Sequence, residues 1–113
     1  MVVGGLRLTA RQPRCWLPNR VGGRLPRGYR SFADQLLRAG ASAGANFVEG
    51  ANRRTAGEKR NAFGKARGEA GEAAGHAEML ATLGLLPWEQ AHRVMGLADR
   101  LCAVLTKLLQ RWR

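Results

Sequence analysis

The chain is 113 residues long, with 45% hydrophobic residues, 24% charged residues and a net charge of +11. This length and composition suit one soluble domain with a modest core and exclude a multidomain protein. No apolar run approaches the roughly 20 residues that a membrane-spanning helix needs, and the opening MVVGGLRLTARQPR lacks the continuous apolar segment of a secretory signal. We therefore expect a cytoplasmic protein that does not enter a membrane.

The N-terminal part of the chain is basic and rich in helix-breaking residues. Residues 1–30 hold seven arginines and no acidic residue, whereas residues 31–113 hold twelve basic and eight acidic residues. Prolines and glycines interrupt this part at short intervals, so only about residues 5–12 can form a turn or two of helix. The pattern predicts an irregular segment over residues 1–25 and a helical domain over residues 26–113. A genuine arginine-rich arm, a wrongly chosen start codon and a shifted reading frame all remain open as explanations.

The most informative segment of the chain is a predicted helix that ends near residue 50. Its apolar residues recur at steps of three and four, which places them on one face of a helix. They are Phe32, Leu36, Ala39, Ala43 and Phe47. The same segment carries a polar set that an apolar face does not require, namely Gln35, Arg38, Ser42, Asn46 and Glu49, followed by Gly50.

This polar set resembles the pattern Q-x-R-R-A-x-x-S-I-x-x-N-I-A-E-G-x-x-R of the bacterial four-helix-bundle protein family, the ribosomal-RNA intervening-sequence proteins. The resemblance continues through AFGKARGEAGE at 62–72 and ATLGLL at 81–86, and it covers about residues 25–113. It implies an all-α fold, an antiparallel helical bundle whose first helix is here short, irregular or missing. Because relatives of this fold are similar to ring-shaped oligomers, often pentamers, it also implies a homo-oligomer. Departures from the family include Gly44, Phe47, Gly64, Gly71 and Gly75.

The polar residues of this signature have two interpretations. In the structural one, Asn46 bonds a neighbouring helix, and Glu49 pairs with Arg38 or Arg53 across a seam because a partly buried charge needs a partner. In the other, these side chains contact a ligand directly. We favour the structural interpretation.

A second helix is predicted from Ala56 to Leu83. Thr55 and Glu58 have the spacing of a capping box, in which the threonine oxygen accepts from the Glu58 amide and the glutamate reaches back to the cap amide. The expected core face consists mostly of small residues, namely Ala62, Phe63, Ala66, Ala70, Ala73, Ala77 and Leu80. Four interior glycines, at 64, 68, 71 and 75, each cost roughly 1 kcal/mol relative to alanine. We expect a close approach of helix backbones to compensate for this cost.

A third helix is predicted after Gly84, which ends the second, and Pro87, which opens the next. Its apolar face contains Trp88, Ala91, Val94, Met95, Ala98, Leu101, Cys102, Leu105, Leu108, Leu109 and Trp112. On the opposite face, cations recur every seven residues, at Arg93, Arg100 and Lys107. This face is either exposed to solvent or in contact with nucleic acid. Three helices bury less apolar surface than four, so we expect an uncovered seam that the N-terminal segment, a partner or a neighbouring subunit covers.

Motifs for catalysis or cofactor binding are not found in the sequence. Glu89 with His92, and Glu72 with His76, have spacings that metal ligands use on helices, but the first pair flanks the apolar face rather than occupying it. The two cysteines are too few for a disulfide framework, and no phosphate-binding loop is found. We expect a non-enzyme without a metal or cofactor.

The charge distribution favours a non-catalytic protein that binds RNA or DNA through basic side chains. A basic corner is predicted where the first two clear helices meet, from Arg53, Arg54, Lys59, Arg60 and Arg67. Such contacts give an affinity that falls with salt and carries little sequence information. A related branch of the family assists a retroelement reverse transcriptase, so the resemblance implies that partner as well. The alternative is a structural or protein-interaction oligomer whose charge reflects arginine-rich coding, since arginine outnumbers lysine sixteen to three.

Overall fold

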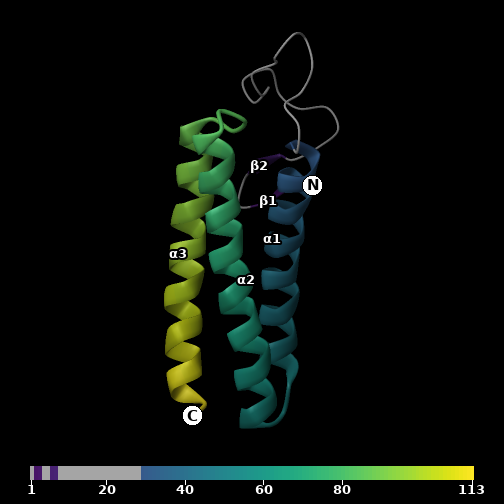
Figure 1. Ribbon diagram of the computed structural model, residues 1–113. Coiled ribbons are helices and arrows are strands. Elements are labelled where there is room, and N and C mark those ends of the chain that lie inside the picture. The colour runs from purple at the N-terminus through teal and green to yellow at the C-terminus, as the bar shows by residue number, and fades with distance from the viewer. Residues whose placement is uncertain (1, 4–5, 8–28) are drawn as a thin grey trace.

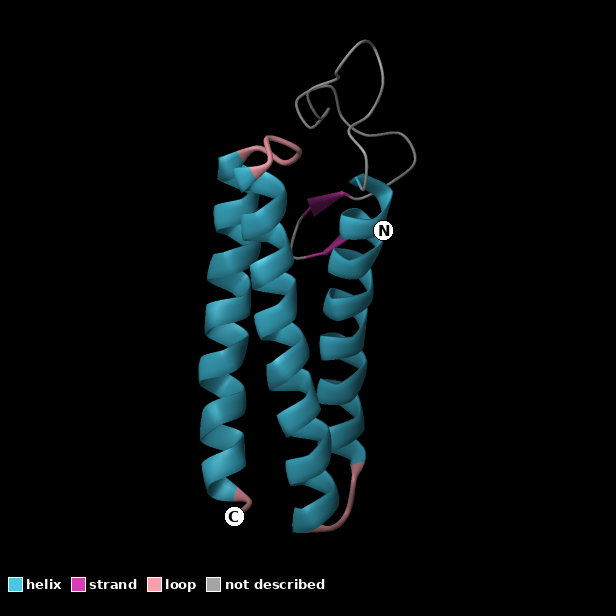
Figure 2. Ribbon diagram, in the orientation of Figure 1, coloured by secondary structure: helices cyan, strands magenta, loops and turns pink. Residues whose placement is uncertain are grey.

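The computed structural model describes residues 2–3, 6–7 and 29–113, and three long helices dominate this part of the chain (Figure 1). The helices are α1 (Tyr29–Asn52), α2 (Ala56–Thr82) and α3 (Trp88–Arg111), and short loops make neighbours antiparallel (Figure 2). The two-residue strands β1 (Val2–Val3) and β2 (Leu6–Arg7) pair antiparallel, with Val2 opposite Arg7. The all-α prediction is confirmed, but no fourth helix lies within the described ranges.

The N-terminal prediction lies mostly outside the described residues. Within residues 1–25, the structure describes only the four strand residues, and β1 lies against α1. The turn of helix expected over about residues 5–12 is wrong at Leu6 and Arg7, which form β2.

The connections between helices follow local rules that the sequence carries. Thr55 is the N-cap of α2, and its Oγ1 accepts a hydrogen bond from the Glu58 amide at 3.2 Å. Only this half of the predicted capping box forms, because the Glu58 carboxylate lies beside Arg53 instead. After α2, Gly84 has a φ of 74°, a left-handed conformation that glycine tolerates, and the Leu85 amide donates to the Leu80 carbonyl. Pro87 is the N-cap of α3 rather than its first helical residue.

The helix α2 is the centre of the core, because α1 and α3 both pack against it. All seven residues predicted to face the core from α2 are buried, and five of them are alanines. At one end of the molecule the core contains Leu36, Leu80 and Leu85; at the other it contains Phe63 and Leu105. The α3 face is less fully covered than predicted, since Trp88 is 47% exposed.

The interior glycines of α2 do not bring helix backbones together, so that expectation is wrong. A Cβ atom placed at Gly64, Gly68, Gly71 or Gly75 would meet no atom within 4 Å. Helical geometry places Gly64, Gly68 and Gly71 on the face of α2 that points away from α1 and α3, while Gly75 lies beside a groove between α1 and α2. Packing within this chain therefore does not offset their cost in helix stability.

The close approach occurs instead at Gly50, near the end of α1. A Cβ atom at this position would lie 2.6 Å from Cε1 of Phe63, and the Phe63 side chain is itself only 3% exposed. Phe47 also contacts this ring, at 6.0 Å between ring centroids. The glycine of the signature is therefore required by packing, because no larger residue fits between α1 and the Phe63 ring.

Alanine substitutions distinguish these two kinds of glycine. We expect Gly64→Ala with Gly71→Ala to raise the free energy of unfolding by about 1 kcal/mol for each site, since helix propensity improves without a clash. Gly50→Ala should lower it by about 1 to 3 kcal/mol through overpacking. Urea unfolding followed by circular dichroism measures both. A loss of stability in the first variant would show that the outer face of α2 is covered in solution.

Candidate nucleic-acid interface

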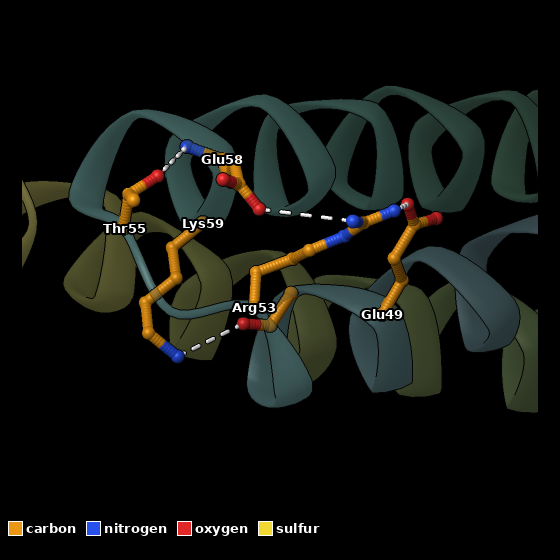
Figure 3. Close-up of polar contacts among 6 residues, drawn as sticks. Glu49, Arg53, Thr55, Glu58 and Lys59 are labelled. Carbon is orange, nitrogen blue, oxygen red and sulfur yellow. Dashed lines mark hydrogen bonds and ion pairs between the residues drawn. The ribbon is translucent and has the colours of Figure 1, made fainter.

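The predicted basic corner lies at the connection from α1 to α2, and its first member is already paired (Figure 3). Arg53 Nη2 donates to Glu49 Oε1 at 2.6 Å, and Arg53 Nη1 lies 3.7 Å from Glu58 Oε2. The hydrogen bond that Arg53 donates to Glu49, together with the negative charges of Glu49 and Glu58, raises the pKa of Arg53 above its ordinary value. Two carboxylates neutralise this cation, which makes it a poor ligand for phosphate.

The same contact explains Glu49 in the signature. Of the two partners predicted for Glu49, Arg53 is confirmed, but the pair lies within one stretch of chain rather than across a seam. The Glu49 side chain is 48% exposed, so the expectation of a partly buried charge is wrong. Its role is local, because it holds Arg53 over the start of α2 where Glu58 lies (Figure 3).

Lys59, predicted to bind nucleic acid, has a structural role at this end of the bundle. Its Nζ donates to the carbonyl oxygens of Gly50 at 3.1 Å and Ala51 at 3.3 Å, which are among the last carbonyls of α1. The same ammonium lies 5.1 Å from the ring centroid of Trp112, just after α3. One side chain of α2 therefore connects the ends of all three helices.

Arg67 makes the second cross-link of this region. Its Nε donates to Thr106 Oγ1 at 2.9 Å, and that hydroxyl in turn donates to the Cys102 carbonyl at 2.8 Å. The thiol of Cys102, a free cysteine, donates to the Arg67 carbonyl at 3.7 Å. Arg67 thus orients α2 against α3, although its side chain remains exposed.

Five predicted cations remain exposed and make neither an ion pair nor a side-chain hydrogen bond with any described residue. They are Arg54 and Arg60 at the corner and Arg93, Arg100 and Lys107 on α3. We call the last three the α3 stripe. The structure therefore reduces the predicted corner to two unpaired members and leaves the stripe as it was predicted.

The remaining signature residues precede Glu49 at steps of three and four, so they lie on the same side of α1. Asn46 Nδ2 donates to the Ser42 carbonyl at 2.9 Å and to Ser42 Oγ at 3.2 Å, so it bonds its own helix and not a neighbour as predicted. Gln35 donates weakly to Ser31 Oγ at 3.5 Å. Gln35 and Arg38 line a groove of about 590 Å³ between α1 and α2, whose other lining residues are Ala39, Glu69, Glu72, Gly75, His76 and Met79.

The histidines do not form a metal site in the described part of the chain. The ring of His92 packs against Trp88, with 5.5 Å between ring centroids. Within residues 2–3, 6–7 and 29–113, no group of three His, Cys, Asp or Glu side chains could hold a metal ion. No described helix has both the length and the apolar character to cross a membrane.

Sequence reasoning missed the position and shape of one further feature, an apolar groove of about 310 Å³ between α1 and α3. Its lining residues are Gly40, Ala43, Gly44, Ala70, Ala73, Val94, Leu97, Ala98 and Leu101. The signal was present as the run of glycine and alanine in α1 and of alanine in α2, because such side chains leave space between helices. The sequence pattern gave only the expectation of an uncovered seam.

The structural role of Lys59 can be tested by comparing its alanine variant with the alanine variant of its neighbour Arg60. We expect Lys59→Ala to lower the free energy of unfolding by about 1 to 2 kcal/mol, because two carbonyls of α1 and the Trp112 ring lose their cation. Arg60→Ala removes the same charge from a side chain without such contacts and should change stability by less than about 0.5 kcal/mol. Chemical denaturation of both variants measures this difference, and equal effects would contradict the assignment.

Comparison with known proteins identifies a family. Residues 25–107 match the family model described as 23S rRNA-intervening sequence protein. Neither the curated proteins nor the solved structures give a significant match. The family match begins just before α1 and extends into the last turns of α3, so it covers the three helices that form the core. The chain therefore belongs to the 23S rRNA-intervening sequence protein family.

Proposed function

We propose that this protein is a non-catalytic RNA-binding protein that contacts the phosphate backbone through its unpaired surface cations. The observation that carries the proposal is the exposure of Arg54, Arg60 and the α3 stripe without any ion-pair partner among the described residues. In a chain with a net charge of +11, these cations attract a polyanion and release its counterions.

The arrangement supports backbone contact rather than recognition of base sequence. Charge neutralisation holds a phosphate backbone but carries no sequence information. The Trp112 ring, which lies beside Lys59 of the corner, is covered by Lys59 and by Arg111 at 5.5 Å from its centroid. It is therefore poorly placed to stack on a base. The description of the family, which names a 23S rRNA intervening sequence, supports RNA as the polymer.

The proposal extends to assembly, where the family resemblance implies a homo-oligomer and a reverse-transcriptase partner. An oligomer would repeat each cationic cluster and raise the affinity for a long RNA by multivalency. Light scattering on the protein in the binding buffer gives the number of subunits and is independent of the RNA measurement. The second candidate, an interaction protein without RNA binding, is favoured by the uncovered apolar groove.

Charge reversal tests the RNA proposal. We expect Arg54→Glu with Arg60→Glu to weaken binding of a labelled RNA hairpin by about tenfold at moderate salt, since each lost phosphate contact costs roughly threefold. The slope of log affinity against log salt concentration should fall by about two. Fluorescence anisotropy across a salt series, with the RNA hairpin and a DNA duplex of equal length, measures both quantities.

The matched control reverses two cations that lie elsewhere. Arg30→Glu with Lys65→Glu changes the net charge by the same amount; both side chains are exposed, Arg30 at the start of α1 and Lys65 about 140° around α2 from Arg60. This control should keep most of the affinity. If the two double variants lose affinity equally, net charge and not the corner governs binding. If the unmodified protein binds neither polymer at low salt, the interaction-protein alternative is the better account.

A further inference from the structure

The apolar groove between α1 and α3 is shaped to receive another helix. Gly40 and Gly44 of α1, four residues apart, form one wall, and the alanines Ala70 and Ala73 of α2 form the floor. A Cβ atom at Gly44 would meet no atom within 4 Å, so this wall is open. Small side chains let helix axes approach to about 8 Å, the lower end of the usual range for packed helices.

The α3 side of this groove combines apolar and cationic residues. Leu97 and Leu101 line the groove. On a helix, Leu97 is a direct neighbour of Arg93, four residues before it, and of Arg100, three residues after it. Val104, which is 48% exposed, lies between Arg100 and Lys107 in the same way. The α3 stripe therefore borders the apolar surface along one edge.

The α1 side of the groove carries little charge. Ala41 and Ala45 are exposed beside the groove wall, and Val48, one turn beyond Gly44, is 59% exposed. An occupant thus meets small apolar residues along α1 and a line of cations along α3. This asymmetry defines the chemistry of the partner, because unpaired cations at the edge of an apolar surface favour carboxylates there.

We propose that this groove docks an amphipathic helix of another protein, with its apolar face against the alanine floor and acidic residues along the α3 stripe. RNA cannot cover the groove, since it offers no apolar face of this shape. The chain's own residues 1–28 contain six arginines and no acidic residue, so they would place like charges beside the stripe. A second copy carries the same net charge of +11, so its approach to this basic edge is electrostatically disfavoured.

Peptide binding tests this docking surface. The probe is a fluorescein-labelled peptide of about 18 residues, roughly 27 Å as a helix, with leucines at heptad spacing and glutamates along one flank. The comparison peptide has lysines in place of the glutamates. We expect the full-length protein to bind the acidic peptide at least about tenfold more tightly, and Arg93→Glu with Arg100→Glu to reverse this preference.

Two leucine substitutions separate docking in the groove from general attraction to a basic protein. Gly44→Leu fills the open wall and should abolish binding of the acidic peptide. Gly68→Leu, which adds the same side chain on the outer face of α2, should leave it unchanged. Gly44 and Gly68 both have open space around them, and circular dichroism checks that both variants are folded.

Three outcomes would overturn the proposal. Equal affinity for the two peptides would show that the stripe does not select acidic partners. The absence of binding by either peptide would show that the groove is not accessible to a helix. An oligomer that Gly44→Leu dissociates, seen by light scattering, would show that a second copy occupies the groove. None of these results bears on RNA binding through Arg54 and Arg60, so the two proposals fail independently.

Discussion

The structure depends on one constraint, the packing of two helices against a central helix whose core face is almost entirely alanine. Alanine contributes little apolar area, so α1 and α3 must lie close to α2 for the core to exclude water. The larger side chains that stabilise this arrangement gather at its two ends, around Leu36 and Leu80 and around Phe63 and Leu105. The middle of the bundle therefore has few large side chains in its core. The apolar groove lies there because alanine and glycine side chains do not extend far enough to fill it.

At one end of the bundle, polar contacts of cationic side chains add to this sparse apolar packing. Lys59 bonds the last carbonyls of α1 and lies over Trp112, and Arg53 bridges Glu49 and Glu58. A structural use of cations reduces the number available for a ligand. The net charge of +11 therefore overstates the number of cations that a phosphate backbone could contact, and the unpaired residues rather than the total define the proposed interface.

Much of the fold could be predicted because it rests on local rules. The cap at Thr55, the left-handed turn at Gly84 and the core face of α2 each follow from a residue and its neighbours within a few positions. The role of Gly50 could not be derived in this way, because it depends on the Phe63 ring of another helix. The same holds for Lys59. A lysine in a basic sequence cluster resembles a phosphate ligand until the structure places carbonyls and an indole ring around it.

The candidate interface likewise has one part that the sequence predicted and one part that it did not. The seven-residue spacing of the α3 stripe is a helical property, so the sequence predicted its exposure. What the sequence did not show is that the stripe borders the groove, because this requires the position of α1 relative to α3. That adjacency links the two proposals. Carboxylates of a docked helix and phosphates of RNA would compete for Arg93, Arg100 and Lys107. Arg54 lies in the connection from α1 to α2 and Arg60 in the first turns of α2, so both would remain available to RNA. Docking of an acidic helix would then weaken the interaction with RNA without abolishing it, since only one of the two cationic clusters is covered.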